Sequence, residues 1–182
     1  MWTRVTAALL VCAGMAAVAP VFGGINSTIP VSEQSASSFA ASVFPVSVPL
    51  EGATLYLTEP RVLFLDSERI GIRLRFQAYD HRPEAGIAIS ETGLALLSGR
   101  PAYDRATRQV LLHAPRMDEV TFDRDNQAAR QLSQRVRQAW SSQFTDTVRS
   151  DLPPHPYLTP LRDHLADIIY DGRTIKLLVV YQ

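Results

Sequence analysis

Three arginines that recur along one predicted strand are the residues best suited to binding an anion. Arg69, Arg73 and Arg75 fall on one side of segment 69–79, because successive side chains of a strand point to opposite faces. Guanidinium groups bind phosphates and carboxylates through paired, charge-assisted hydrogen bonds. The row is therefore a candidate site for an anionic head group. The alternative is a solvent-facing sheet surface whose arginines pair with acidic side chains.

The histidines do not follow any catalytic or metal-binding spacing. Asp163, His164 and Asp167 lie close together in sequence, but this pattern is more typical of a solvated helix face than of a metal site. The chain has no nucleophile elbow, phosphate-binding loop or dinucleotide fingerprint. We therefore predict a non-enzymatic protein with no metal and no cofactor. An enzyme of unrecognised type would need its scattered histidines to converge in one cleft: His81, His113, His155 and His164.

An apolar stripe on a predicted long helix, 125–149, offers a different kind of site. Its members recur at the three- and four-residue spacing of an amphipathic helix, and they are Leu132, Val136, Trp140 and Phe144. One interpretation is plain core packing. The other is a groove for an acyl chain, in which Leu74 and Phe76 of the arginine-bearing strand would face the helix. The two are compatible, because a curved sheet around a helix can leave a groove between them.

The segments that must position these residues show two periodicities. Helical spacing predicts a helix over 33–43, ended by Phe44-Pro45, the long helix 125–149, and a short helix over 161–169. Alternation predicts antiparallel strands joined by short connections, with turns at 81–84 and 98–104. The expected strands are 46–58, 62–65, 69–79, 87–96, 109–113 with its continuation 119–122, and 174–181.

These elements predict an α+β fold in which a curved antiparallel sheet wraps around the long helix. We expect a single domain over 32–182, preceded by a polar linker over 25–31. The length suits one domain with a real hydrophobic core.

Residues 1–24 have the pattern of a cleavable secretory signal. A charged start is followed by an apolar run, 5–18, which is shorter than the roughly 18 residues that a membrane-spanning helix needs. We expect cleavage after Gly23 or Gly24 and export to the periplasm; an uncleaved anchor is the alternative. The only cysteine, Cys12, lies inside this leader, so the mature chain would have no disulfide. Removal of the leader would also leave the basic and acidic residues of the mature chain almost equal in number, which argues against nucleic acid as a partner.

Several segments resemble a known family. They are Phe44-Pro45-Val46, the LTEPRV segment 57–62, the GRPAYD segment 99–104 and the LHAP segment 112–115. Together with the order of elements over 29–182, this pattern resembles the YceB-like family of uncharacterised bacterial envelope lipoproteins (domain of unknown function 1439). The resemblance implies half of a tubular lipid-binding (TULIP-like) module, with no catalytic residues to carry over. Family lipoproteins end their leader in a lipidated cysteine. Here bulky Val11 precedes Cys12, so we expect a soluble rather than a lipid-anchored protein.

The sequence thus favours a periplasmic protein that binds a lipid-like ligand between sheet and long helix. Association with a membrane surface is compatible with this function, but spanning is not expected. The alternative is an envelope adaptor that binds another protein through an exposed strand or the arginine face. That alternative predicts a filled core and a large apolar surface patch.

Overall fold

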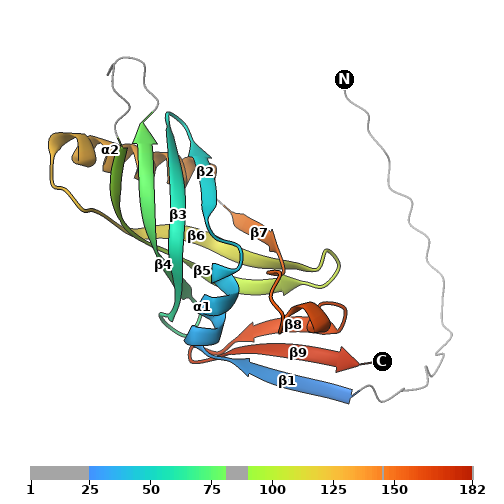
Figure 1. Ribbon diagram of the computed structural model, residues 1–182. Coiled ribbons are helices and arrows are strands. Elements are labelled where there is room, and N and C mark those ends of the chain that lie inside the picture. Colours follow the sequence, from blue (N-terminus) through green and yellow to red (C-terminus); the bar gives the residue numbers. More distant parts are fainter. Residues whose placement is uncertain (1–24, 81–89, 145, 182) are drawn as a thin grey trace, which may run out of the picture.

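The computed structural model describes residues 25–80, 90–144 and 146–181, which form two antiparallel sheets, two α-helices and one short 3-10 helix (Figure 1). The predicted signal segment therefore lies outside the described residues. The helices are α1 (Glu33–Ala41), α2 (Gln127–Gln143) and the 3-10 helix η2 (Thr159–Leu161). The strands are β1 (Ile25–Val31), β2 (Val46–Leu50), β3 (Ala53–Phe64), β4 (Ile70–Asp80), β5 (Ser90–Asp104), β6 (Gln109–Phe122), β7 (Thr147–Asp151), β8 (Leu165–Tyr170) and β9 (Ile175–Tyr181).

The larger sheet has six strands in the order β2-β3-β4-β5-β6-β7, so each strand pairs with the next along the chain. It is strongly curled into a half-barrel, with α2 at one end and a three-stranded sheet at the other (Figure 1). The predicted α+β class with a curved antiparallel sheet is therefore confirmed. Strand β4 is also confirmed, because Leu74, Phe76 and Ala78 are buried while Arg73 and Arg75 are exposed.

Several strands are longer than predicted because irregular pairing replaces the expected turns. The predicted turn at 98–104 is wrong: this segment is the second half of β5, and Arg100–Asp104 pairs with Gln109–His113. A register shift between Ser98 and Arg100 places one extra residue in β6, where Ala114 has a φ of 46°, while β5 continues through Gly99 and Pro101. In β3, a shift between Thr58 and Arg61 likewise joins two predicted strands into one.

Helix α2 is shorter than the predicted helix 125–149. Asn126 caps its start by accepting a hydrogen bond from the Ala129 N–H, and the helix ends at Phe144, whose N–H bonds back to Trp140. Residues 147–151 form β7 instead, paired with β6. The β-branched Thr147 and Val148 suit that strand better than a helix. With 17 residues, α2 covers one end of the half-barrel and is not the long central helix that was expected.

The three-stranded sheet, in the order β1-β9-β8, overturns two predictions. Residues 25–31 are not a linker, because β1 pairs with β9 from Ile25↔Tyr181 to Val31↔Ile175. The segment 161–169 is not a helix, because 165–170 forms strand β8. A register shift between Leu165 and Asp167 adds one residue to β8, which gives its apolar residues the spacing of a helix.

Helix α1, predicted over 33–43, forms over Glu33–Ala41. It packs against β3 where β3 has no strand partner on that side. Strand β2 pairs only with the first half of β3, up to Leu57. Beyond that point, the Val62 N–H donates to Ser37 Oγ at 2.8 Å, and the Phe64 N–H donates to Glu33 Oε1 at 2.5 Å. Side chains of α1 thus satisfy backbone groups that would otherwise be open at the sheet edge.

Candidate functional site

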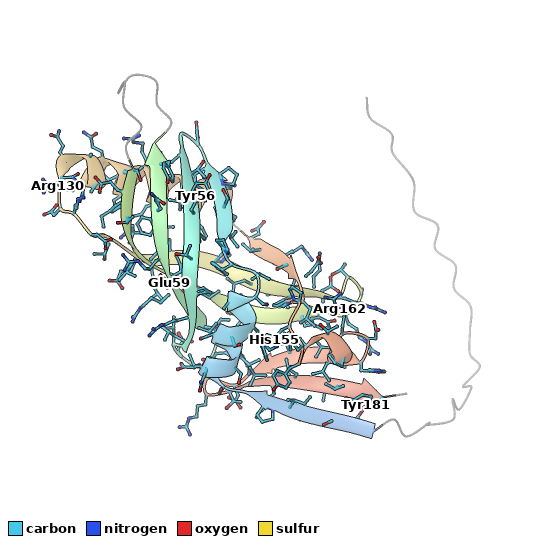
Figure 2. All side chains as sticks on the ribbon, viewed as in Figure 1. Tyr56, Glu59, Arg130, His155, Arg162 and Tyr181 are labelled. Atoms are coloured by element: carbon cyan, nitrogen blue, oxygen red, sulfur yellow. The ribbon has the colours of Figure 1, made fainter. Side chains whose placement is uncertain are left out.

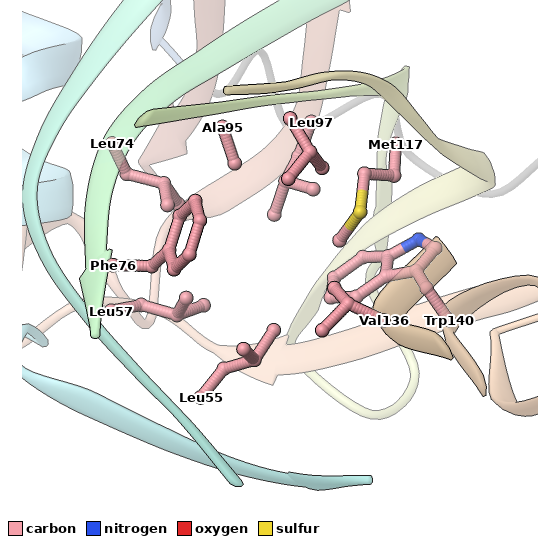
Figure 3. A pocket seen from close by; sticks show the side chains of 10 residues that line it. Leu55, Leu57, Leu74, Phe76, Ala95, Leu97, Met117, Val136 and Trp140 are labelled. Carbon is pink, nitrogen blue, oxygen red and sulfur yellow. The ribbon is translucent and has the colours of Figure 1, made fainter. Parts of the chain in front are cut away.

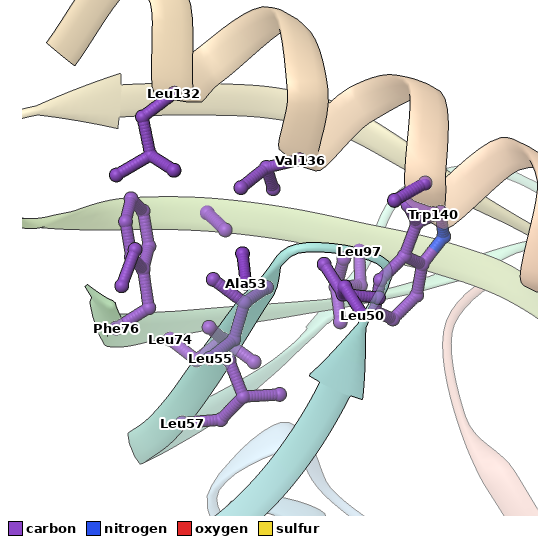
Figure 4. Packing of buried hydrophobic residues seen from close by; sticks show 13 residues of the cluster. Leu50, Ala53, Leu55, Leu57, Leu74, Phe76, Leu97, Leu132, Val136 and Trp140 are labelled. Atoms are coloured by element: carbon purple, nitrogen blue, oxygen red, sulfur yellow. The ribbon is translucent and has the colours of Figure 1, made fainter. Parts of the chain in front are cut away.

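The predicted groove under α2 is a filled core. Leu132, Val136 and Trp140 of α2 point toward Leu74 and Phe76 of β4, as Figures 3 and 4 show. These side chains are almost completely buried, and the space that they enclose has no room for even a water molecule. The five residues therefore meet as predicted, but what they form in the described structure is packing and not a groove. Small neighbours on the sheet allow the helix to approach this closely: Ala53, Ala78 and Ala95.

Phe144, the last residue of the predicted stripe, lies at the margin of this core. Its ring packs on Trp140 with 4.3 Å between centroids. On their outer side the two rings border an open surface depression between α2 and β6, where Arg116, Asp118 and Arg137 supply polar walls. This depression is wide open and mixed in character, so it is a poorer fit for an apolar chain than a cavity with a nearly all-apolar wall.

A partly open apolar cavity lies instead in the other half of the molecule. It has a volume of about 400 Å³ and lies between α1, the six-stranded sheet and the three-stranded sheet. This volume falls within the roughly 300–1,000 Å³ typical of small-molecule pockets. The residues that line it are Val31, Ala36, Phe39, Ala40, Val43, Phe44, Val46, Val62, Ile70, Ile72, Pro101, Val110, Leu111, Leu112, Val148, Ser150, Asp151, Leu152, Pro153, Leu158, Ile168, Ile175 and Leu177.

The space exists because the elements around it present small or β-branched side chains. On α1, Ala36 and Ala40 face the cavity one helical turn apart, so the helix wall is low. Phe39 lies beside them, and its ring meets the His155 ring edge-on at 4.7 Å; Figure 2 shows His155 next to α1. The sequence predicts a helix over 33–43, but nothing in its pattern shows that the helix would leave space beside the sheets.

The wall of this cavity is nearly all apolar, and its polar groups gather at the rim. Ser150 and Asp151 are the only side chains in the lining with a hydroxyl or a charge, and both are exposed. Both offer oxygen atoms that accept hydrogen bonds. Val43, also exposed, lies at the same rim. A ligand in this space would therefore place an apolar body inside and a hydrogen-bond donor at the rim.

The cavity lies against both edges of the half-barrel sheet. Strands β2 and β7 are the two edges of the six-stranded sheet, and both contribute to the lining, through Val46 on β2 and Val148 and Ser150 on β7. Neither edge has a strand partner on its outer side in the described structure. Edges that lack a partner can move without breaking a ladder of hydrogen bonds, so we expect a ligand to enter on this side of the molecule.

The predicted arginine row does not meet the apolar cavity. Arg69 donates to Ser98 Oγ at 2.8 Å and to the Ala114 carbonyl at 3.2 Å, so it has a structural role at the sheet. Arg75 forms an ion pair with Asp123 at 3.0 Å. Arg73 is exposed on the outer face, whereas the neighbouring Ile72 lines the cavity on the inner face. One ligand therefore cannot occupy the cavity and also contact the arginines.

The described histidines each have a different environment. His113 Nδ1 lies 2.9 Å from Thr147 Oγ1, and His164 packs on Tyr181 with 4.8 Å between centroids. His155 Nε2 lies 3.4 Å from Ser38 Oγ, a pairing that resembles a nucleophile and its base. His81 lies outside the described residues.

The geometry does not suit His155 to that role. The Tyr157 N–H donates to His155 Nδ1 at 3.3 Å, so a neutral ring carries its proton on Nε2 and cannot accept one from Ser38.

Among the described residues, no group of three or more histidine, cysteine, aspartate or glutamate side chains is placed to hold a metal ion.

Two tyrosines border the cavity half and have raised pKa values. Burial raises the pKa of Tyr103, whose hydroxyl has no hydrogen-bond partner in the described structure. Burial also raises the pKa of Tyr170, helped by the nearby negative charges of Asp66 and Glu33; its hydroxyl donates to the Asp66 carbonyl at 2.8 Å. Both phenols therefore stay neutral over the physiological range and act here as structural groups.

No protein-family model matches the chain, and no curated protein matches it significantly. The resemblance to the YceB-like family therefore rests on the sequence segments alone. In the part of the chain that the structure describes, neither helix has the length and apolar character needed to cross a bilayer.

Proposed function

We propose that this protein is a non-enzymatic binder of an apolar or amphipathic ligand, held in the cavity between α1 and the two sheets. The ligand class is the one that the sequence favoured, but the position differs from the predicted groove under α2. The leader pattern supports an exported, periplasmic protein as the setting for this function.

The observation that carries the proposal is the size of an apolar cavity within a small fold. The cavity is partly open to solvent, and apolar wall that stays in contact with water forgoes roughly 25 cal/mol per Å² of the stabilisation that burial gives. Whole domains are stable by only about 5–15 kcal/mol. An occupant that removes apolar surface of its own from water would offset this cost.

The polar groups at the rim narrow the class of ligand. Asp151 and Ser150 offer acceptors, and the Asp151 carboxylate would repel an anionic head group at that position. A long-chain alcohol or amine therefore fits better than a fatty acid. We expect hexadecanol to bind more tightly than palmitate at neutral pH.

The alternative of a protein adaptor is less well supported by this geometry. It predicted a filled core and a large apolar surface patch. The half of the molecule closed by α1 instead has an apolar cavity, and its lining includes side chains that are buried, such as Val62, Leu158 and Leu177.

Cavity-filling variants test the proposal directly. Ala36→Leu and the double variant with Ala40→Leu place extra methyl groups in the cavity, whereas Ala41→Leu makes the same change on an exposed position of the same helix. Binding is measured by fluorescence of N-phenyl-1-naphthylamine and by its displacement with hexadecanol. Native mass spectrometry of the gently purified protein reports any bound lipid.

We expect wild type and Ala41→Leu to bind the probe equally, and the double variant to bind at least about tenfold more weakly, because its cavity is occupied. Thermal melting in parallel shows that the double variant is folded. Equal binding by a folded double variant would overturn the proposal, as would a wild-type protein that binds neither probe nor hexadecanol.

A further inference from the structure

The outer face of the six-stranded sheet carries a second hollow, of about 310 Å³, beside the bulge in β3. Arg61 on β3 and Arg73 on β4 both line it and are register partners. Register partners of an antiparallel pair project directly opposite each other from the same face. Two exposed guanidinium groups therefore stand together at one point of the sheet.

The bulge is what brings the two arginines together. Thr58 pairs with Arg75, so regular pairing would place residue 60 opposite Arg73 and Arg61 opposite Ile72. One extra residue in β3 shifts this register, which moves Arg61 from the inner to the outer face. Glu59, labelled in Figure 2, takes a left-handed backbone with φ 51° within the bulge. Such strain in a residue other than glycine persists only where the surrounding structure imposes it.

Neither arginine of this pair is neutralised in the described structure. Like charges directly opposite each other destabilise an antiparallel pair, yet the side chains of Arg61 and Arg73 have neither a hydrogen bond nor an ion pair among the described residues. Arg75, two residues along the same strand, is paired with Asp123. Glu59 also lines the hollow, but it forms no ion pair with any residue that the structure describes.

We propose that Arg61 and Arg73 form a clamp for a single phosphate group. Two guanidinium groups match the charge and the several acceptor oxygens of a phosphate, and binding would relieve their mutual repulsion. Leu63 and Leu94 line the same hollow, and Leu94 is 42% exposed, so the site also accepts an apolar portion next to the phosphate. The phosphate belongs either to the head group of an anionic phospholipid or to a free phosphate compound.

This site is independent of the proposed cavity ligand. Ile72 faces the cavity and Arg73 faces outward, so the sheet separates the two sites. The cavity-filling variant Ala36→Leu should leave phosphate binding unchanged, and failure of either proposal leaves the other standing.

Two probes distinguish the sources of the phosphate. Inorganic phosphate is titrated by calorimetry, and vesicles of phosphatidylcholine, with or without phosphatidylglycerol, are used in co-sedimentation. The variants are Arg61→Gln and Arg73→Gln. The control is Arg105→Gln, an exposed arginine in the β5–β6 turn that lies outside the hollow.

We expect each clamp variant to bind at least about tenfold more weakly, since each loses a charge-assisted contact, while the control stays within about twofold of wild type. Binding of inorganic phosphate with this pattern identifies a free phosphate compound. Binding only to vesicles that contain phosphatidylglycerol identifies a lipid head group. The proposal is overturned if neither probe binds, or if both clamp variants bind as well as the control. A folded state for each variant is verified by its melting temperature.

Discussion

The two halves of the half-barrel use the same curled sheet but are closed by different elements, and only one of them is full. Under α2, Leu132, Val136 and Trp140 fill the space above the sheet. Under α1, Ala36 and Ala40 face the sheet and leave a cavity of about 400 Å³. The difference shows that the size of the side chains on the covering helix decides whether the space between helix and curled sheet is filled or left as a cavity.

Truncating one buried leucine in each half gives the largest expected contrast. Leu132→Ala removes a side chain that is packed on all sides, and we expect it to lower the free energy of unfolding by about 4 kcal/mol. Leu177→Ala removes a side chain that already borders open space and therefore loses fewer contacts, so we expect a loss of about 2 kcal/mol. Urea denaturation of the lipid-free protein measures both. Equal losses would mean that the two halves are equally well packed.

Two glycines of β5 provide a smaller contrast of the same kind. A Cβ at Gly93 would lie well inside contact distance of the Thr121 carbonyl oxygen and 2.8 Å from Phe76 Cζ. A Cβ at Gly99 would mainly meet the side chain of Leu112, which lines the cavity and has room to move into it.

We therefore expect Gly93→Ala to destabilise the protein by about 3 kcal/mol and Gly99→Ala by only about 1 kcal/mol. Thermal melting gives the comparison. If Gly99→Ala were the more damaging of the two, the cavity could not be taking up the displaced side chain.

Features that depend on local sequence pattern were predictable, whereas features that depend on how side chains pack together were not. Strand β4 was predictable because its alternation is strict. Strand β8 was missed because the register shift between Leu165 and Asp167 gives its apolar residues a helical spacing. The stripe on α2 was correctly grouped with Leu74 and Phe76, but spacing along a chain does not show whether facing side chains leave space between them.

The surface sites show this limit even more clearly. The clamp arginine Arg61 was missed because one extra residue in β3 reverses the face to which it points. The partner of Arg75 is Asp123, which is distant in sequence. Such pairings depend on register, which a single sequence specifies only weakly wherever bulges occur.

Adding volume should change stability in opposite directions in the two halves. Ala95→Leu forces extra atoms into the filled core, and we expect a loss of about 2 kcal/mol. Ala36→Leu puts the same atoms into open space, and we expect no loss or a gain of up to about 1 kcal/mol. Urea midpoints without ligand measure both changes. A destabilised Ala36→Leu would indicate that the cavity is smaller than its lining suggests.

The smallest expected effect is a loss of stability at low pH, and it also distinguishes the two halves. Asp171 lies in the β8–β9 turn, next to the cavity half. A hydrogen bond from Lys176, followed by bonds from the Arg173 and Thr174 N–H groups, lowers its pKa to about 2. A carboxyl group whose pKa is lower in the folded state stabilises the fold above its unfolded pKa, near 4, and that contribution disappears as the pH falls through about 2.

Two further turns on this side of the molecule add to the effect in the same direction. Bonds from the Glu68 and Arg69 N–H groups lower the pKa of Asp66, and bonds from Thr107 lower that of Asp104.

Wild type should therefore be more stable than Asp171→Asn at neutral pH, and the difference between their urea midpoints should shrink between pH 4 and 2. Asp118→Asn makes the same change at an exposed position on β6, outside these turns, and is the control. A difference for Asp171→Asn that stays constant over this range would mean that the β8–β9 turn does not depend on its charge. Acid would then not loosen the cavity half ahead of the half packed under α2.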